Sequence, residues 1–216
     1  MSMSDLIADR TDSLLSGRPE LPAAGMADAI SAGAGIFRAM GLRAVVGVPC
    51  NTFHAGPIWK AFTKRLESIK PQPQLINMID EAIASIRDNF PAGSGVGILS
   101  TTGTRKERIY SGPLGDAGFS VIEPDDQEAV HSMIYNPDWG IKASARVSSR
   151  AAEEVRTQID KLSARGAGLV ILGCTELPLA LETGAVPAVK LLDPMSVLAR
   201  ALVNAADPDK LRIEQH

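Results

Sequence analysis

The sequence predicts an α/β fold built on parallel sheets. Short apolar runs alternate with longer amphipathic stretches, which is the pattern of strands and helices in parallel sheets. The runs over residues 44–48 and 169–172 suit strands buried on both faces and are too short for helices. Each run is closely followed by one of the chain's two cysteines, Cys50 and Cys174, where parallel sheets carry their chemistry.

The first half of the chain is expected to contain three strands. The first of them leads into a turn and a short helix through Leu15, which Gly17 ends. Apolar residues at helical spacing predict three longer helices, and Pro71 and Pro73 break the second of these. The strands are expected over residues 2–7, 44–48 and 75–78, and the helices over residues 22–40, 57–69 and 80–90.

The second half is expected to contain four strands, one more than the first. Residues 91–95, rich in glycine, form a flexible joint before it. The strands are expected over residues 96–99, 119–122, 169–172 and 189–192. One helix is expected to begin within residues 100–104 and to be interrupted at Gly112–Pro113, and the others are expected over residues 126–134, 147–165 and 194–204. If the halves are a duplicated unit in which the two cysteines are equivalent, the strand at 96–99 has no counterpart in the first half.

Composition excludes several classes of protein. The 216 residues are 45% hydrophobic and 22% charged, a balance typical of globular chains. The net charge of −3 and pI near 5.7 give no reason to expect nucleic-acid or membrane binding, and no apolar run is long enough to span a bilayer. The N-terminus lacks a signal-peptide pattern, so we expect a cytoplasmic enzyme whose cysteines are free thiols.

No cofactor or metal is expected. The sequence contains no Gly-x-Gly-x-x-Gly motif, and no lysine lies in a recognisable cofactor motif. The histidines, His54, His131 and His216, do not cluster with the cysteines at the spacing of metal ligands.

Two thiols facing one another across a cleft suit proton transfer at carbon. One thiolate can remove a proton from one face of a small molecule while the other thiol returns a proton to the opposite face, which inverts a stereocentre. Cys50 and Cys174 are expected at strand-to-helix turns, where backbone N–H groups and the helix dipole favour a thiolate. Because one must be thiolate while the other is thiol, the pair is expected to titrate together. The alternative for a single cysteine after a strand is a small apolar core residue.

Polar residues just past the strand ends are candidates for binding carboxylate oxygens. They are Asn51, Thr52, Thr101, Thr102, Thr104 and Thr175. The alternative for each threonine is a helix N-cap, and the two roles are compatible. Arg10 and Lys142 are candidates for a second carboxylate, although spacing alone favours solvated surface charges for both.

Four motifs carry a family resemblance: Pro49-Cys-Asn-Thr-Phe-His54, Leu99-Ser-Thr-Thr-Gly-Thr104, Gly173-Cys-Thr-Glu-Leu-Pro178 and Leu192-Asp-Pro194. Together they resemble the aspartate/glutamate racemase superfamily over roughly residues 5–206, and most closely its aspartate racemase group. Glutamate racemases usually carry His after the second Cys-Thr, where this chain has Glu176.

The resemblance implies a cofactor-independent two-base racemase that acts on a small acidic amino acid and forms a homodimer. It implies two similar α/β sub-domains, each a parallel sheet between helices, with the active site in the cleft between them. It implies that Cys50 and Cys174 are the catalytic pair and that Arg10 and Lys142 are the family's basic substrate-binding residues. It also matches five positions to carboxylate binding: Asn51, Thr52, Thr101, Thr104 and Thr175. The implied domains are residues 1–92 plus about 194–216, whose C-terminal helix returns to the first domain, and residues 93–193.

The chain departs from the family at its front. Members usually begin with a strand, a Gly-Gly-Met-Gly-type loop and a helix, none of which precedes the segment that contains Arg10. Either the start codon is wrongly assigned or the first sub-domain is shortened.

The expected function is inversion of the α-carbon of aspartate or a close acidic relative. The alternatives are a related activity, of the hydantoin racemase, arylmalonate decarboxylase or maleate isomerase type, and an inactive shortened homologue that binds an acidic metabolite or a partner protein.

Overall fold

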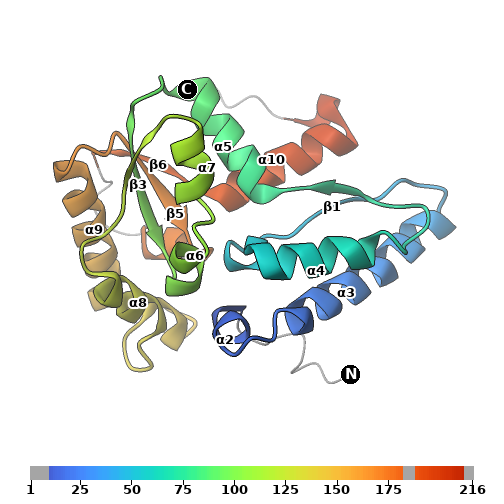
Figure 1. Ribbon diagram of the computed structural model, residues 1–216, viewed down its shortest axis with the longest axis horizontal. Helices are drawn as coiled ribbons and strands as arrows, with labels where there is room; N and C mark the ends of the chain where they lie inside the picture. The colour runs from blue at the N-terminus through green and yellow to red at the C-terminus, as the bar shows by residue number, and fades with distance from the viewer. Residues whose placement is uncertain (1–9, 182–187, 212–216) are drawn as a thin grey trace.

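A computed structural model describes residues 10–181 and 188–211, and these form two parallel sheets with helices on both sides (Figure 1). The smaller sheet pairs β1 (Val45–Gly47) with β2 (Gln74–Ile76). The larger sheet has the order β4-β3-β5-β6, built from β3 (Gly95–Ser100), β4 (Ser120–Ile122), β5 (Leu169–Gly173) and β6 (Lys190–Leu192). The α/β fold predicted from the alternation of elements is therefore confirmed.

The larger sheet is buried because both faces are covered by apolar helices. Alternate residues of β5 point to opposite faces: Ile171 packs into a core with α5 (Met78–Asn89), α7 (Ser111–Asp116) and α10 (Pro194–Ala206). Val170 packs into a second core with α8 (Gln127–Tyr135) and α9 (Ser149–Ala164). In Figure 1, α8 and α9 lie on one side of this sheet and α5 and α10 on the other.

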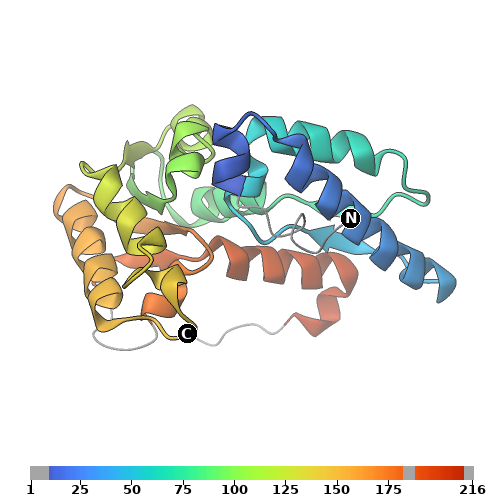
Figure 2. The same cartoon turned by 90° about the horizontal axis from the view of Figure 1, so that it is seen from below.

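The smaller sheet has its own core with α3 (Glu20–Ala39) and α4 (Gly56–Leu66), in which Phe53 and Phe62 are fully buried. The C-terminal helix α10 packs against β1 so closely that a Cβ on Gly47 would lie 2.7 Å from Leu198. Figure 2 shows α10 extending from the larger sheet toward β1. The division of the chain into domains at residues 92 and 194 stays a prediction.

The helices and strands begin and end close to the predicted positions, with local corrections. The helix expected over 57–69 ends at Leu66, and the strand expected to reach residue 78 ends at Ile76 because Asn77 caps α5 through the Ile79 N–H (2.9 Å). The helix predicted to begin within residues 100–104 is two helices, α6 (Thr102–Lys106) and α7, and the interruption expected at Gly112–Pro113 is wrong because both residues lie inside α7. The strand expected over residues 2–7 lies outside the described residues.

The segment after each cysteine also differs from expectation. Cys50 is followed by the 3₁₀ turn η1 (Thr52–His54), and Cys174 is followed by a turn and then the 3₁₀ helix η3 (Leu177–Leu181). Neither cysteine is followed directly by an α-helix. Turns this short align few peptide dipoles. The expected help from a helix dipole in forming a thiolate is therefore small at both positions.

Candidate active site

A small cavity lies where the ends of both sheets meet, and it brings together eight of the ten predicted site residues. Its volume is about 90 Å³, well below the roughly 300–1,000 Å³ of pockets for drug-sized ligands. Its lining comprises Arg10, Thr11, Pro49, Cys50, Asn51, Thr52, Thr101, Tyr135, Lys142, Gly173, Cys174, Thr175 and Glu176. A pocket of this size suits a small metabolite.

The order of the larger sheet explains why the cavity forms there. The chain moves from β3 outward to β4 and then returns to β5 on the other side of β3, so β3 and β5 flank a topological switch point. Ser100 pairs with Gly173 at the carboxyl ends of these strands, which brings Thr101 and Cys174 to the same edge. A Cβ on Gly173 would lie 2.8 Å from the Leu99 carbonyl oxygen, so this close register requires glycine.

The helix α2 (Arg10–Leu15) closes the cavity from the other side. It packs on α6 where Gly103 has no side chain, since a Cβ there would lie 2.9 Å from Thr11 Oγ1. This contact places Arg10 and Thr11 in the cavity wall. Among the described residues, the Arg10 side chain forms no ion pair or hydrogen bond, which leaves its guanidinium available to an anion.

Cys174 is buried and holds its proton. Its Sγ donates a hydrogen bond to Glu176 Oε2 at 2.9 Å, and Thr175 Oγ1 donates to the same oxygen at 3.0 Å. Burial and the neighbouring Glu176 carboxylate raise the pKa of Cys174 well above its ordinary value, although Lys142 opposes them. Cys174 is therefore a thiol at neutral pH, contrary to the expectation of a helix-stabilised thiolate.

Cys50 has a different environment. It is partly exposed, and among the described residues its sulfur forms no hydrogen bond. Its backbone carbonyl accepts a hydrogen bond from His54 Nδ1 at 2.9 Å, and the His54 ring stacks on Trp59 with centroids 4.5 Å apart. Burial lowers the pKa of His54 to about 4, so this histidine is neutral and anchors the Cys50 backbone. The two thiols are thus unequal.

Lys142 lies beside the buried thiol. Its Nζ is 3.5 Å from Glu176 Oε1 and 4.4 Å from the centre of the Tyr135 ring, and it donates to Tyr135 Oη at 3.4 Å. Burial alone would lower the pKa of Lys142, but Cys174, Tyr135 and Glu176 together raise it above its ordinary value. Burial raises the pKa of Glu176, but the hydrogen bond from Cys174 and the positive charge of Lys142 lower it by more. The pKa of Glu176 is therefore below its ordinary value. The pair is an ammonium beside a carboxylate.

Three threonines form a closed ring of hydroxyls behind the cavity wall. Thr52 Oγ1 lies 3.1 Å from Thr101 Oγ1 and 2.9 Å from Thr104 Oγ1, and the last two are 3.1 Å apart. The ring joins the residues after β1 to those after β3, and all three residues are buried. Thr101 also caps α6 through the Thr104 N–H at 3.3 Å. Thr104 does not line the cavity and contacts the other two threonines instead.

The comparisons with known proteins agree with this arrangement. The family model described as Asp/Glu/Hydantoin racemase matches residues 2–202. The chain belongs to this racemase family. An aspartate racemase of Picrophilus torridus is similar at 25% identity with a TM-score of 0.69, covering 93% of this chain and 75% of that one. A putative Asp/Glu racemase from Yersinia pestis is similar at 25% identity with a TM-score of 0.65, covering 91% and 79%.

Two curated relatives match part of the chain. A glutamate racemase of Carboxydothermus hydrogenoformans is 28% identical over 138 residues, which are 62% of this chain and 49% of that protein. An uncharacterised protein of Pectobacterium carotovorum subsp. carotovorum is 35% identical over 111 residues, 50% of this chain and 69% of that one. Both the aspartate and the glutamate branches of the racemase family are thus represented among the similar proteins.

Sequence reasoning about this racemase family member missed several residues at the cavity. Glu176, Tyr135 and Thr11 line it. Glu176 directly follows the Cys174-Thr175 pair. A carboxylate so close in sequence to a thiol is the signal that could have identified it as a site residue. Thr102, a predicted carboxylate ligand, lies outside the cavity lining, and its hydroxyl lies 3.2 Å from His131 Nδ1.

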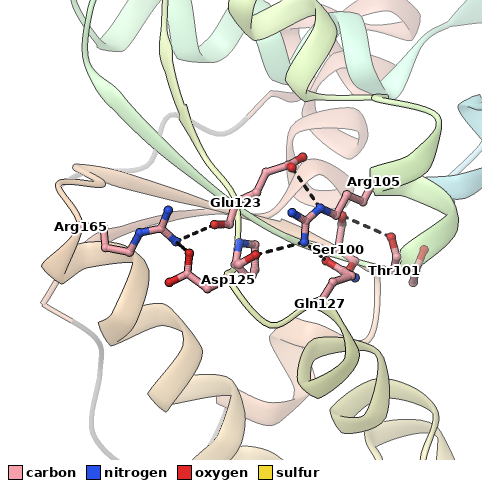
Figure 3. Close-up of polar contacts among 8 residues, drawn as sticks. Ser100, Thr101, Arg105, Glu123, Asp125, Gln127 and Arg165 are labelled. Carbon is pink, nitrogen blue, oxygen red and sulfur yellow. Dashed lines mark hydrogen bonds and ion pairs between the residues drawn. The ribbon is translucent and has the colours of Figure 1, made fainter.

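A polar network holds the end of β3 in place (Figure 3). Arg105 Nε donates to Glu123 Oε2 at 3.0 Å, and its Nη1 donates to Gln127 Oε1 at 3.2 Å. Gln127 Nε2 in turn donates to the Ser100 carbonyl at 2.9 Å. The network ties α6 and α8 to the residue before Thr101, and so it fixes the floor of the racemase cavity.

Within residues 10–181 and 188–211 no group of three or more His, Cys, Asp or Glu residues is arranged to hold a metal ion. In the same ranges no helix is long and apolar enough to cross a membrane.

Proposed function

We propose that this member of the racemase family inverts the α-carbon of aspartate, or of a close acidic relative, with Cys50 and Cys174 as the two bases and no cofactor. The observation that carries the proposal is that cysteines from the ends of strands in different sheets line one small cavity together with Arg10 and Lys142. A homodimeric state and a cytoplasmic location stay predictions.

The chemistry is a proton exchange between two sulfurs through the substrate carbon. A thiolate at one wall removes the α-proton and becomes a thiol. The electron pair left on the α-carbon delocalises into the adjacent carboxylate. The thiol at the other wall then delivers its proton to the opposite face and becomes a thiolate. The configuration is inverted, and the two cysteines have exchanged protonation states.

The unequal environments assign the first step. Cys174 carries a proton that is bonded to Glu176, so it serves as the acid toward the first substrate that enters. Cys50, whose sulfur has no hydrogen-bond partner among the described residues, serves as the base. The free enzyme is thus expected to accept first the enantiomer whose α-hydrogen faces Cys50.

The charges of the cavity favour an acidic substrate. Arg10 and Lys142 bring two positive charges and Glu176 one negative charge, and aspartate carries two carboxylates and one ammonium. The guanidinium of Arg10 can hold one carboxylate in a bidentate manner. Donors from the side-chain amide of Asn51 and from the backbone N–H groups of Thr52 and Thr175 suit the α-carboxylate, where negative charge grows in the transition state.

The test is exchange of the α-hydrogen in heavy water, followed by proton NMR for each enantiomer of aspartate and glutamate. Wild-type protein is expected to exchange both enantiomers of its substrate and to racemise them. Cys50→Ser and Cys174→Ser are each expected to lose racemisation and to retain exchange of a single enantiomer, a different one in each variant.

Three outcomes would contradict the proposal. Absence of exchange with all four amino acids, together with a thermal shift on adding aspartate, would identify a binding protein. Turnover of a hydantoin, an arylmalonate or maleate in their place would assign a related activity. Loss of exchange with both enantiomers in only one serine variant would identify a one-base enzyme.

A further inference from the structure

We infer that Tyr110 is a positioning residue that fixes the side-chain amide of Asn51 so that its Nδ2 donors face the cavity and bind a substrate carboxylate. This inference rests on the proposed function. Tyr110 itself does not line the cavity, and it acts through Asn51.

In the hydrogen bond between Tyr110 and Asn51, only the Tyr110 hydroxyl can be the donor. The Tyr110 hydroxyl contacts Asn51 Oδ1, and a carbonyl oxygen only accepts, so the hydroxyl donates. The Oδ1 end of the amide therefore points at Tyr110 and the Nδ2 end points away. Asn51 is 4% exposed and lines the cavity, and among the described residues its Nδ2 group donates no hydrogen bond. Two donors are left for a ligand.

Tyr110 is held as a permanent donor. It is 1% exposed within the core shared by α5, α7 and β3. Burial, with the charges of Asp193 and Cys50, raises the pKa of Tyr110 well above its ordinary value. The hydroxyl therefore keeps its proton at neutral pH, and the amide of Asn51 has a fixed partner.

The backbone adopts a left-handed conformation at Arg108, two residues before Tyr110, and this conformation is strained for a residue other than glycine. Helix α6 ends with the Arg108 N–H bonded to the Arg105 carbonyl (2.9 Å) and the Ile109 N–H bonded to the Thr104 carbonyl (3.2 Å), the pattern of a Schellman motif. The left-handed residue of that motif is usually glycine, but here it is Arg108 with φ of 52°. This turn directs Ile109 and Tyr110 into the interior.

The contact also joins the two sheets at the site. Asn51 follows β1 in the smaller sheet, and Tyr110 lies between α6 and α7 beside the larger one. Asn51 directly follows Cys50, so the same bond sets the position of the amide relative to this partly exposed thiol. A carboxylate held by Nδ2 would be placed beside that sulfur.

The kinetic test compares Tyr110→Phe, which removes only the hydroxyl, with wild type. Because the amide already binds the carboxylate in the substrate complex, KM is expected to rise about ten-fold; kcat is expected to fall as well, since negative charge grows on that carboxylate in the transition state. In the Asn51→Ala background, the same change is expected to alter KM by less than about two-fold. Ile109→Val is the matched control: it trims a neighbouring buried side chain and is expected to lower Tm without moving KM.

An unchanged KM in Tyr110→Phe, or an equal rise in both backgrounds, would overturn the inference.

A readout independent of turnover is NMR of protein labelled with ¹⁵N-asparagine, in which the Asn51 side-chain signal is the one that Asn51→Ala removes. That signal is expected to shift when aspartate is added to wild type, and to move and broaden in Tyr110→Phe without ligand. A signal that Tyr110→Phe leaves unchanged would refute the inference. If the signal responds but wild type exchanges no α-hydrogen, the proposed function fails and the positioning role stands.

Discussion

Replacing Glu176 with Gln tests whether a carboxylate keeps the second thiol protonated. Glu176 Oε2 lies 2.9 Å from Cys174 Sγ. Two unit charges at that distance repel by about 6 kcal/mol at an effective dielectric constant of about 20, and by about 1.4 kcal/mol at about 80. Since the amide of Gln carries no charge, this repulsion disappears in Glu176→Gln while Lys142 remains beside the sulfur. The pKa of Cys174 is therefore expected to fall.

The size of the effect follows from these energies. At a pH below the pKa, the thiolate fraction of Cys174 rises at least about ten-fold, since about 1.4 kcal/mol is a factor of about ten. A less basic thiolate is also a weaker nucleophile, which cancels about half of the gain on a logarithmic scale. The rate of alkylation of Cys174 is thus expected to increase between about three-fold and about a hundred-fold.

The assay is iodoacetamide alkylation at fixed pH in a Cys50→Ser background, with the Cys174 peptide quantified by mass spectrometry. Glu123→Gln is the matched control, because it neutralises another partly buried carboxylate that forms an ion pair with a basic residue, Arg105, and that does not contact Cys174. A rate in Glu176→Gln that equals the background rate, or falls below it, would refute the role assigned to the carboxylate.

Three further predictions concern stability. Arg108→Gly relieves a left-handed φ and is expected to stabilise the protein by about 1 kcal/mol, or about 2–4 °C in Tm by calorimetry; a lower Tm would show that the turn is not strained. Because burial lowers the pKa of His54 to about 4 from 6.5, the unfolded chain binds more protons between these values. Wild type should lose about 3 kcal/mol as the pH falls from 6.5 to 4, and urea unfolding of His54→Gln should lack that part of the loss. Gly173→Ala is expected to cost about 1–3 kcal/mol in urea unfolding, and Gly168→Ala, with its nearest atom at 3.9 Å, is expected to cost less.

Local sequence was sufficient for most elements and for the approximate place of the site. The apolar run that β5 occupies could be predicted because strands buried on both faces need continuous apolar residues, and all five β5 residues are buried. The run over residues 44–48 also forms a strand, β1, but its residues are only half-buried, so the expectation of burial on both faces was wrong there. Each cysteine follows the carboxyl end of a parallel strand, which is where such sheets carry their sites, and this placement could be predicted from strand direction alone. However, β1 and β5 belong to different sheets, so the meeting of the two cysteines at one cavity depends on how the sheets pack and is not a local property.

What could not be predicted depends on contacts between distant residues. The break between α6 and α7 falls at Arg108, and no sequence rule marks an arginine as a left-handed residue. The bond between Tyr110 and Asn51 joins residues 59 positions apart. The protonation of Cys174 depends on its burial and on the side chains of Glu176 and Lys142, whose positions are set by the fold.

In the proposed reaction, thermodynamics limits which kinetic constants the inequality of the two thiols can change. Free enantiomers of aspartate have equal free energies, so the ratio kcat/KM must be the same in both directions for any racemase. The bond from Cys174 to Glu176 therefore cannot favour one direction in kcat/KM. The two directions can therefore differ in kcat and in KM only by the same factor. The enantiomer for which Cys50 is the base binds to the more populated form of the free enzyme. A carboxylate on one side of a nearly symmetric cavity thus sets which enantiomer binds more tightly and leaves the equilibrium unchanged.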